Sequence, residues 1–136
     1  MTLRLLDTNA VIALVSRRSE TLLQRIEAAE PGSLGISSVV AHELYFGAYR
    51  SEKVEFNLET LRLLFSDLSI LDFDREDARA AGQIRAELKR RGTPIGPYDV
   101  LIAGQAKARN LTLVTNNTGE FSRIAGLRVE DWTTNG

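Results

Sequence analysis

The sequence contains no cysteine and only one histidine, His42, among its 136 residues. The absence of cysteine excludes disulfides and thiolate metal sites, and it is consistent with a reducing, cytoplasmic location. A single histidine gives little support for a His-rich zinc site or a Ser-His-Asp triad. A metal site in this chain therefore needs oxygen ligands, which favours Mg²⁺ or Mn²⁺.

Long apolar runs and a strong net charge are also absent. No run approaches the roughly 18 apolar residues of a membrane span, and the N-terminus lacks the pattern of a signal peptide. We therefore expect a cytoplasmic protein without a membrane segment. The formal net charge is −1, so no overall basic field indicates a nucleic-acid partner. A cluster of acids could nevertheless mask a basic surface.

Short apolar runs alternate with amphipathic segments along the whole chain. Strands are predicted at residues 3–6, 34–36, 69–73, 111–114 and 127–129. Helices are predicted from residue 10 onward and at residues 20–29, 39–49, 54–65, 74–91 and 98–109, with a loop at 116–119. This alternation predicts an α/β/α sandwich with a mostly parallel sheet of about five short strands. We expect one domain, residues 1–132, and a frayed tail, residues 133–136.

Asp7 ends the first predicted strand and directly precedes the first predicted helix. Ligands of parallel α/β sheets bind at the carboxyl ends of the strands, so Asp7 is a candidate functional residue. The alternative is that Asp7 or Asn9 only caps the helix.

Two further acids, Glu43 and Asp99, have mainly apolar residues three and four positions away on their predicted helices. A lone buried carboxylate is strongly unfavourable unless it is paired or binds a metal. The alternatives are that Asp99 complements the helix dipole and that Glu43 pairs with an arginine such as Arg85. His42 is interpreted as a partly exposed helix residue rather than a metal ligand. If the three acids converge, they form an all-oxygen site for a divalent cation.

A polar segment, Thr115 to Asn117, follows the fourth predicted strand and is succeeded by Glu120. These side chains also fall at the carboxyl end of a strand. Asn and Gly dominate turns, so a simple turn followed by a solvated acid is the alternative interpretation.

Four motifs together resemble the PIN-domain family, and more narrowly the VapC toxins of type II toxin–antitoxin systems. They are Leu-Asp-Thr-Asn (6–9), Ala-His-Glu-Leu (41–44), Ile-Gly-Pro-Tyr-Asp-Val-Leu-Ile-Ala (95–103) and Val-Thr-Asn-Asn-Thr-Gly-Glu-Phe (114–121). The resemblance covers nearly the whole chain. It implies a Mg²⁺- or Mn²⁺-dependent endoribonuclease, commonly a homodimer, that inhibits translation by cutting structured RNA, often tRNA. It also implies inhibition by a VapB-type antitoxin.

The resemblance assigns Asp7, Glu43 and Asp99 to the three core metal-binding acids of the family. Many PIN domains have an aspartate where Asn117 stands and another acid where Glu120 stands. The amide at 117 leaves the fourth ligand open, and with it the choice between one and two metals. The residues that match positions lining the site are Thr8, Asn9, Thr115, Asn116 and Asn117.

A metal held by these acids lowers the pKa of bound water and polarises the phosphate, which is the chemistry that phosphodiester hydrolysis needs. Basic side chains that could bind phosphates are Arg50, Lys53, Arg85, Lys89, Arg90, Arg91, Lys107 and Arg109. Two other functions stay open. One is a catalytically inactive PIN module that binds RNA or a partner. The other is a phosphotransfer or phosphatase domain, although a haloacid-dehalogenase-type phosphatase needs an acid two residues after Asp7, where this chain has Asn9.

Overall fold

The structure is a computed structural model that describes residues 3–134. Its strands are β1 (Arg4–Leu6), β2 (Leu34–Ser37), β3 (Ser69–Leu71), β4 (Thr112–Val114) and β5 (Val129–Glu130). Its helices are α1 (Thr8–Val15), α2 (Glu20–Ala28), α3 (Ser38–Tyr49), α4 (Val54–Ser66), α5 (Arg75–Arg90), α6 (Pro97–Ala108) and α7 (Thr118–Phe121). Of the predicted tail, residues 135–136 lie outside the described residues. Within it, Thr133 donates hydrogen bonds to the Asp131 carboxylate.

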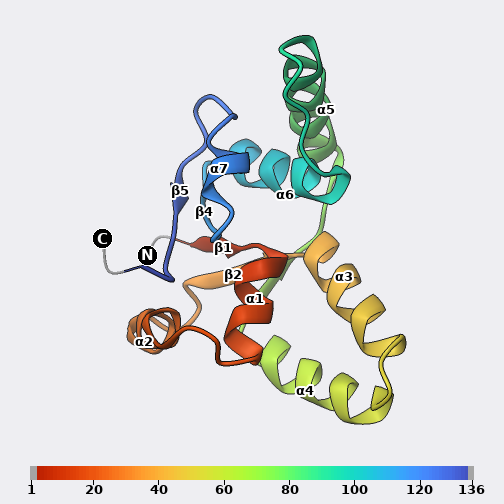
Figure 1. The fold of residues 1–136 in the computed structure, drawn as a ribbon, viewed down its shortest axis with the longest axis vertical. Coiled ribbons are helices and arrows are strands. Elements are labelled where there is room, and N and C mark those ends of the chain that lie inside the picture. Colours follow the sequence, from red (N-terminus) through yellow and green to blue (C-terminus); the bar gives the residue numbers. More distant parts are fainter. Residues whose placement is uncertain (1–2, 135–136) are drawn as a thin grey trace.

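The five strands form one sheet in the order β3-β2-β1-β4-β5, and every adjacent pair is parallel. In the central strand, Leu6 lies in register with Ile36 of β2 and Val114 of β4. Figure 1 shows helices on both faces of the sheet, with α6 and α7 on one side and α1 and α2 on the other. The predicted α/β fold is confirmed. Because all strands run the same way, their carboxyl ends meet at one edge.

The central strands contain almost only apolar residues because helices cover both faces of the sheet. Leu5, Leu6, Ile36 and Leu113 are fully buried, as expected for strands covered on both faces. Helices α5 and α6 pack closely against one another, and α5 projects away from the sheet beyond α6 (Figure 1). A Cβ atom at Gly104 would lie 2.6 Å from the backbone of Ala81 on α5, so only glycine allows this approach.

The predicted boundaries differ from the structure mainly in the last third of the chain. The predicted loop at 116–119 instead leads into the short helix α7, whose Phe121 is fully buried. The fifth strand is Val129–Glu130 rather than 127–129. The reason is a turn, since Gly126 has a φ of 79° and the Leu127 N–H donates to the Ile124 carbonyl.

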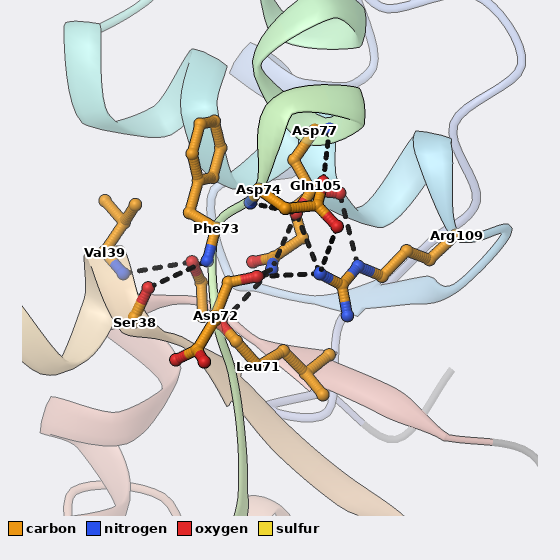
Figure 2. A network of polar contacts seen from close by, with 10 residues as sticks. Ser38, Val39, Leu71, Asp72, Phe73, Asp74, Asp77, Gln105 and Arg109 are labelled. Atoms are coloured by element: carbon orange, nitrogen blue, oxygen red, sulfur yellow. Dashed lines mark hydrogen bonds and ion pairs between the residues drawn. The ribbon is translucent and has the colours of Figure 1, made fainter.

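A buried polar network joins the start of α5 to the end of α6 (Figure 2). Asp77 is 1% exposed and accepts hydrogen bonds from the Arg109 guanidinium and from Gln105 Nε2. Asp74 caps α5 in a reciprocal capping box with Asp77. Arg109 and Gln105 also donate to the Asp72 carbonyl. Arg109 is therefore engaged in holding the fold together, which leaves it poorly placed for the phosphate contact predicted from the sequence.

Candidate active site

Asp7 lies at the carboxyl end of β1, where the parallel sheet and α1 meet. Its side chain is 1% exposed. Oδ1 accepts a hydrogen bond from Ala10 N at 2.8 Å and so caps α1, while Oδ2 accepts one from the Thr115 hydroxyl. Asp7 therefore performs the predicted capping role. Capping alone does not explain why a carboxylate lies buried among other acids.

Glu43 projects from α3, the helix that follows β2, and reaches the start of α1. The Thr8 hydroxyl donates a 2.8 Å hydrogen bond to Glu43 Oε1. The alternative partner suggested by the sequence, Arg85, makes no recorded ion pair with Glu43 within residues 3–134. Thr8 therefore orients Glu43 toward the edge of the sheet where Asp7 lies.

Asp99 lies in the first turn of α6, next to Glu120 of α7. The protonated form of Asp99 shares a side-chain hydrogen bond with Glu120. Glu120 also accepts hydrogen bonds from Gly96 N at 2.8 Å and from the Asn117 amide. The N–H of Asn117 in turn donates to the Thr115 hydroxyl at 2.9 Å. A chain of contacts thus runs from Asp7 through Thr115 and Asn117 to Glu120.

The pKa values show that these carboxylates act on one another. Burial raises the pKa of Asp7 to about 6, and the charges of Glu43 and Glu120 add to the effect. Burial raises the pKa of Asp99 to about 7, with further contributions from the negative charges of Glu120, Asp7 and Glu43. Burial alone would raise the pKa of Glu120, but hydrogen bonds from Gly96, Asn117 and Asp99 hold it below its usual range.

This acid cluster, defined as Asp7, Glu43, Asp99 and Glu120, concentrates negative charge at one edge of the sheet. Within residues 3–134, no three His, Asp or Glu side chains stand close enough to hold a metal ion together as they are oriented here. The donor set nevertheless fits a hard cation, because it consists of oxygens alone. No positively charged group within the described residues contributes to the pKa shifts of Asp7 and Asp99. The one positive charge that shifts the pKa of a described cluster member is that of Arg123, which acts on Glu120 at the edge of the cluster.

The structure places the remaining candidate residues around this cluster. Thr8, Thr115 and Asn117 hydrogen-bond its members, as described above. Asn9 and Asn116 are exposed and line a neighbouring polar pocket of about 530 Å³. Sequence reasoning missed Gly96, whose N–H holds Glu120. Its position directly before a proline at the start of a helix was the available signal, but a backbone donor leaves little trace in a sequence.

The chain is similar to known proteins over nearly its whole length. The PIN domain family matches residues 4–127 of the chain. The chain belongs to the PIN-domain family. Within that family it groups with the VapC endonucleases. It is 44% identical over 129 residues to the tRNA(fMet)-specific endonuclease VapC of Shigella flexneri, covering 95% of this chain and 97% of that protein. It is 41% identical to the ribonuclease VapC2 of Haemophilus influenzae, covering 94% and 96%.

Solved VapC structures share the fold throughout. The DNA-bound VapBC of Salmonella typhimurium has a TM-score of 0.92 and 45% identity, and it covers 97% of this chain and 99% of that chain. VapBC2 of Rickettsia felis, bound to a promoter DNA fragment, has a TM-score of 0.90 and 37% identity, with 96% and 99% covered. The predictions of the VapC family and of a nuclease are confirmed, and the phosphotransfer alternative is set aside.

The predictions of a Mg²⁺ or Mn²⁺ cofactor and of a cytoplasmic location are supported only in part. PIN-domain nucleases generally use a divalent metal ion, although the comparisons do not specify which ion this VapC protein takes. None of the described helices combines the length and apolar character that crossing a membrane requires. The assignment of individual catalytic and metal-binding residues stays a prediction.

Proposed function

We propose that this protein is the toxin of a type II toxin–antitoxin system and acts as a cytoplasmic endoribonuclease on tRNA. Cleavage would inhibit translation until a VapB-type antitoxin neutralises the protein. The observation that carries the proposal is the acid cluster, whose members come from four separate parts of the chain and influence one another's ionisation at the carboxyl edge of the sheet. The substrate class is supported by the names of relatives, which include a tRNA(fMet)-specific endonuclease.

Asp7, Glu43 and Asp99 are the proposed ligands of Mg²⁺ or Mn²⁺, with Glu120 as the additional acid. When bound, the cation supplies an acidified water and a polarised phosphate. Glu120 is preferred to Asn117 as the fourth ligand because the Asn117 amide already donates to the Glu120 carboxylate. Asn117 then acts by orienting Glu120.

Hydrogen bonds around the cluster position its acids for this work. Thr115 holds one oxygen of Asp7, and Thr8 holds one oxygen of Glu43. Asp99, with a pKa of about 7, retains a proton that it shares with Glu120. Cation binding must release this proton, so the affinity for metal should rise with pH through that range.

The proposed assembly is a homodimer inhibited by antitoxin. A partly buried cluster of acids favours a basic side chain, and an arginine inserted between these carboxylates would form charge-assisted hydrogen bonds. The VapBC complexes among the solved structures support a partner of the VapB type.

A substitution at Asp99 tests the proposal directly. We expect Asp99→Asn to reduce RNA cleavage at least about 100-fold, beyond the 10–100-fold typical of residues that only orient a metal ligand. EDTA should abolish cleavage by the wild-type protein, and Mg²⁺ or Mn²⁺ should restore it. The matched control is Glu55→Gln, which removes an exposed acid on α4 and should leave cleavage unchanged. Full activity in Asp99→Asn, or cleavage that resists EDTA, would contradict the metal assignment.

A further inference from the structure

Two rings, those of His42 and Tyr98, lie side by side next to the acid cluster. Their centroids are 5.6 Å apart and their planes are tilted by 47°. His42 directly precedes Glu43 on α3, and Tyr98 directly precedes Asp99 on α6. Figure 1 shows these helices beginning near the same edge of the sheet. The ring pair therefore lies beside two of the proposed metal ligands.

The pair is open to solvent rather than part of the core. Tyr98 is 45% exposed, and His42 is also exposed. Exposed aromatic rings beside a site that acts on nucleic acid are suited to stacking on an unpaired base. Every base has a flat face, so this contact requires no particular sequence.

A groove that carries positive charge is lined in part by the same helix, α6. Pro97 and Val100 of α6 line a groove of about 410 Å³ together with Arg85 and Lys89 of α5. Both cations are exposed, and no ion pair or hydrogen bond to either side chain is recorded within residues 3–134. Unpaired cations beside an apolar surface match the alternating phosphates and bases of a nucleic-acid strand.

We propose that His42 and Tyr98 form a stacking platform for an RNA base next to the cleaved phosphodiester, and that Arg85 and Lys89 bind a phosphate of the same strand. This inference rests on the proposed nuclease function and adds to it a contact that helps select unpaired RNA. The unpaired cations favour an anionic strand over a second copy of this chain as the occupant. Because each ring directly precedes a proposed metal ligand in the chain, a base stacked on the pair would lie near the bond to be cut.

The test compares four proteins on bulk tRNA in the presence of Mn²⁺: wild type, Tyr98→Ala, Tyr98→Phe and Tyr49→Ala. Tyr49 is the matched control because it is a 65% exposed aromatic residue of α3 without a ring partner among the described residues. We expect Tyr98→Ala to raise KM about tenfold, within the range measured for loss of one base–aromatic stack, with kcat little changed. Tyr98→Phe should recover most of that loss, and Tyr49→Ala should match the wild type.

A second measurement identifies the contact with a base. The cut is mapped by sequencing RNA ends, and short synthetic RNAs around it then carry an abasic nucleotide at one flanking position at a time. At one position, the abasic nucleotide should weaken RNA binding by the wild-type protein about as much as the substitution Tyr98→Ala does. The same abasic RNA should bind the Tyr98→Ala variant no more weakly than the intact RNA does.

Several outcomes would overturn the platform. One is an unchanged KM in Tyr98→Ala, and another is an equal rise of KM in Tyr49→Ala. A third is that the abasic nucleotide and Tyr98→Ala weaken RNA binding additively. The last is that Tyr98→Ala sediments as a monomer where the wild type sediments as a dimer. If the wild-type protein cuts no RNA, the proposed function fails and the platform fails with it. If wild type cuts and Asp99→Asn does not, a wild-type KM in Tyr98→Ala refutes the platform alone.

Discussion

Removing the charge of Asp7 should stabilise the metal-free protein at neutral pH. The Asp7 carboxylate is 1% exposed, and the neighbouring charges of Glu43 and Glu120 oppose its ionisation. Asp7→Asn keeps the size of the side chain and an oxygen that can accept the capping bond from Ala10 N. Asn also caps helices about as well as Asp.

The magnitude follows from the raised pKa. Burial raises the pKa of Asp7 to about 6 in the folded protein, from an ordinary value of 3.8. At about 1.4 kcal/mol per unit, ionised Asp7 reduces the free energy of unfolding by about 3 kcal/mol at pH 7. This figure already includes the charge-assisted bond from Thr115, which lowers the pKa of Asp7. The net expectation for Asp7→Asn is therefore about 3 kcal/mol, or about 12 °C in Tm for a chain of this size.

The effect of Asp7→Asn on the stability of the protein depends on pH. Because the folded pKa is raised, the destabilisation is complete above about pH 6 and fades as pH falls toward 3.8. Below pH 4, Asp7 is protonated in both states, so the advantage of Asp7→Asn should vanish or reverse. Thermal melts in EDTA between pH 3 and 8 measure this crossing. Added Mn²⁺ should stabilise wild type by mass action and Asp7→Asn much less.

Three results would refute this reasoning. One is an apo Tm of Asp7→Asn that is unchanged or lower at pH 7. Another is a gain of the same size at every pH, which would show that the effect does not come from ionisation. The third is equal stabilisation of both proteins by Mn²⁺, as expected if Asp7 were only a helix cap.

Two further predictions concern the packing of α5 against α6. Arg109→Ala should lower the free energy of unfolding by about 3 kcal/mol in urea titrations, because it leaves the buried Asp77 carboxylate without its cation. Adding Asp77→Asn should recover part of the loss, and additive losses would contradict the coupling. Gly104→Ala should cost about 1–3 kcal/mol, because its Cβ would lie 2.6 Å from Ala81. The control is Gly82→Ala, whose added Cβ would meet no atom within 4 Å and which should raise the free energy of unfolding by up to about 1 kcal/mol. Equal changes in stability for the two substitutions would refute the steric argument.

The parts of the fold that follow from local pattern could be predicted from the sequence. The central strands are short apolar runs, and Asp74 occupies a standard capping position. The short helix α7 was missed because Asn116 to Gly119 has the composition of a turn, and burial of Phe121 stabilises the helix through contacts distant in sequence.

The acids of the candidate site could be selected because they interrupt apolar patterns. Their mutual arrangement could not, since it depends on tertiary contacts such as the bond from Gly96 N to Glu120. The network around Asp77 was equally invisible, because an acid in the first turn of a helix is ordinary. Arg109 looked like a free cation for the same reason, and only the structure shows its partner.

The order of the strands has a consequence for the timing of activity during synthesis. β1 carries Asp7 but lies between β2 and β4, so the sheet around it is completed only when residues 112–114 have been made. Thr115, Asn117 and Glu120, which hold or complete the acid cluster, come later still. A growing chain therefore has no assembled site while most of it is already outside the ribosome. A nuclease built in this way stays inactive until synthesis of the chain has passed Glu120.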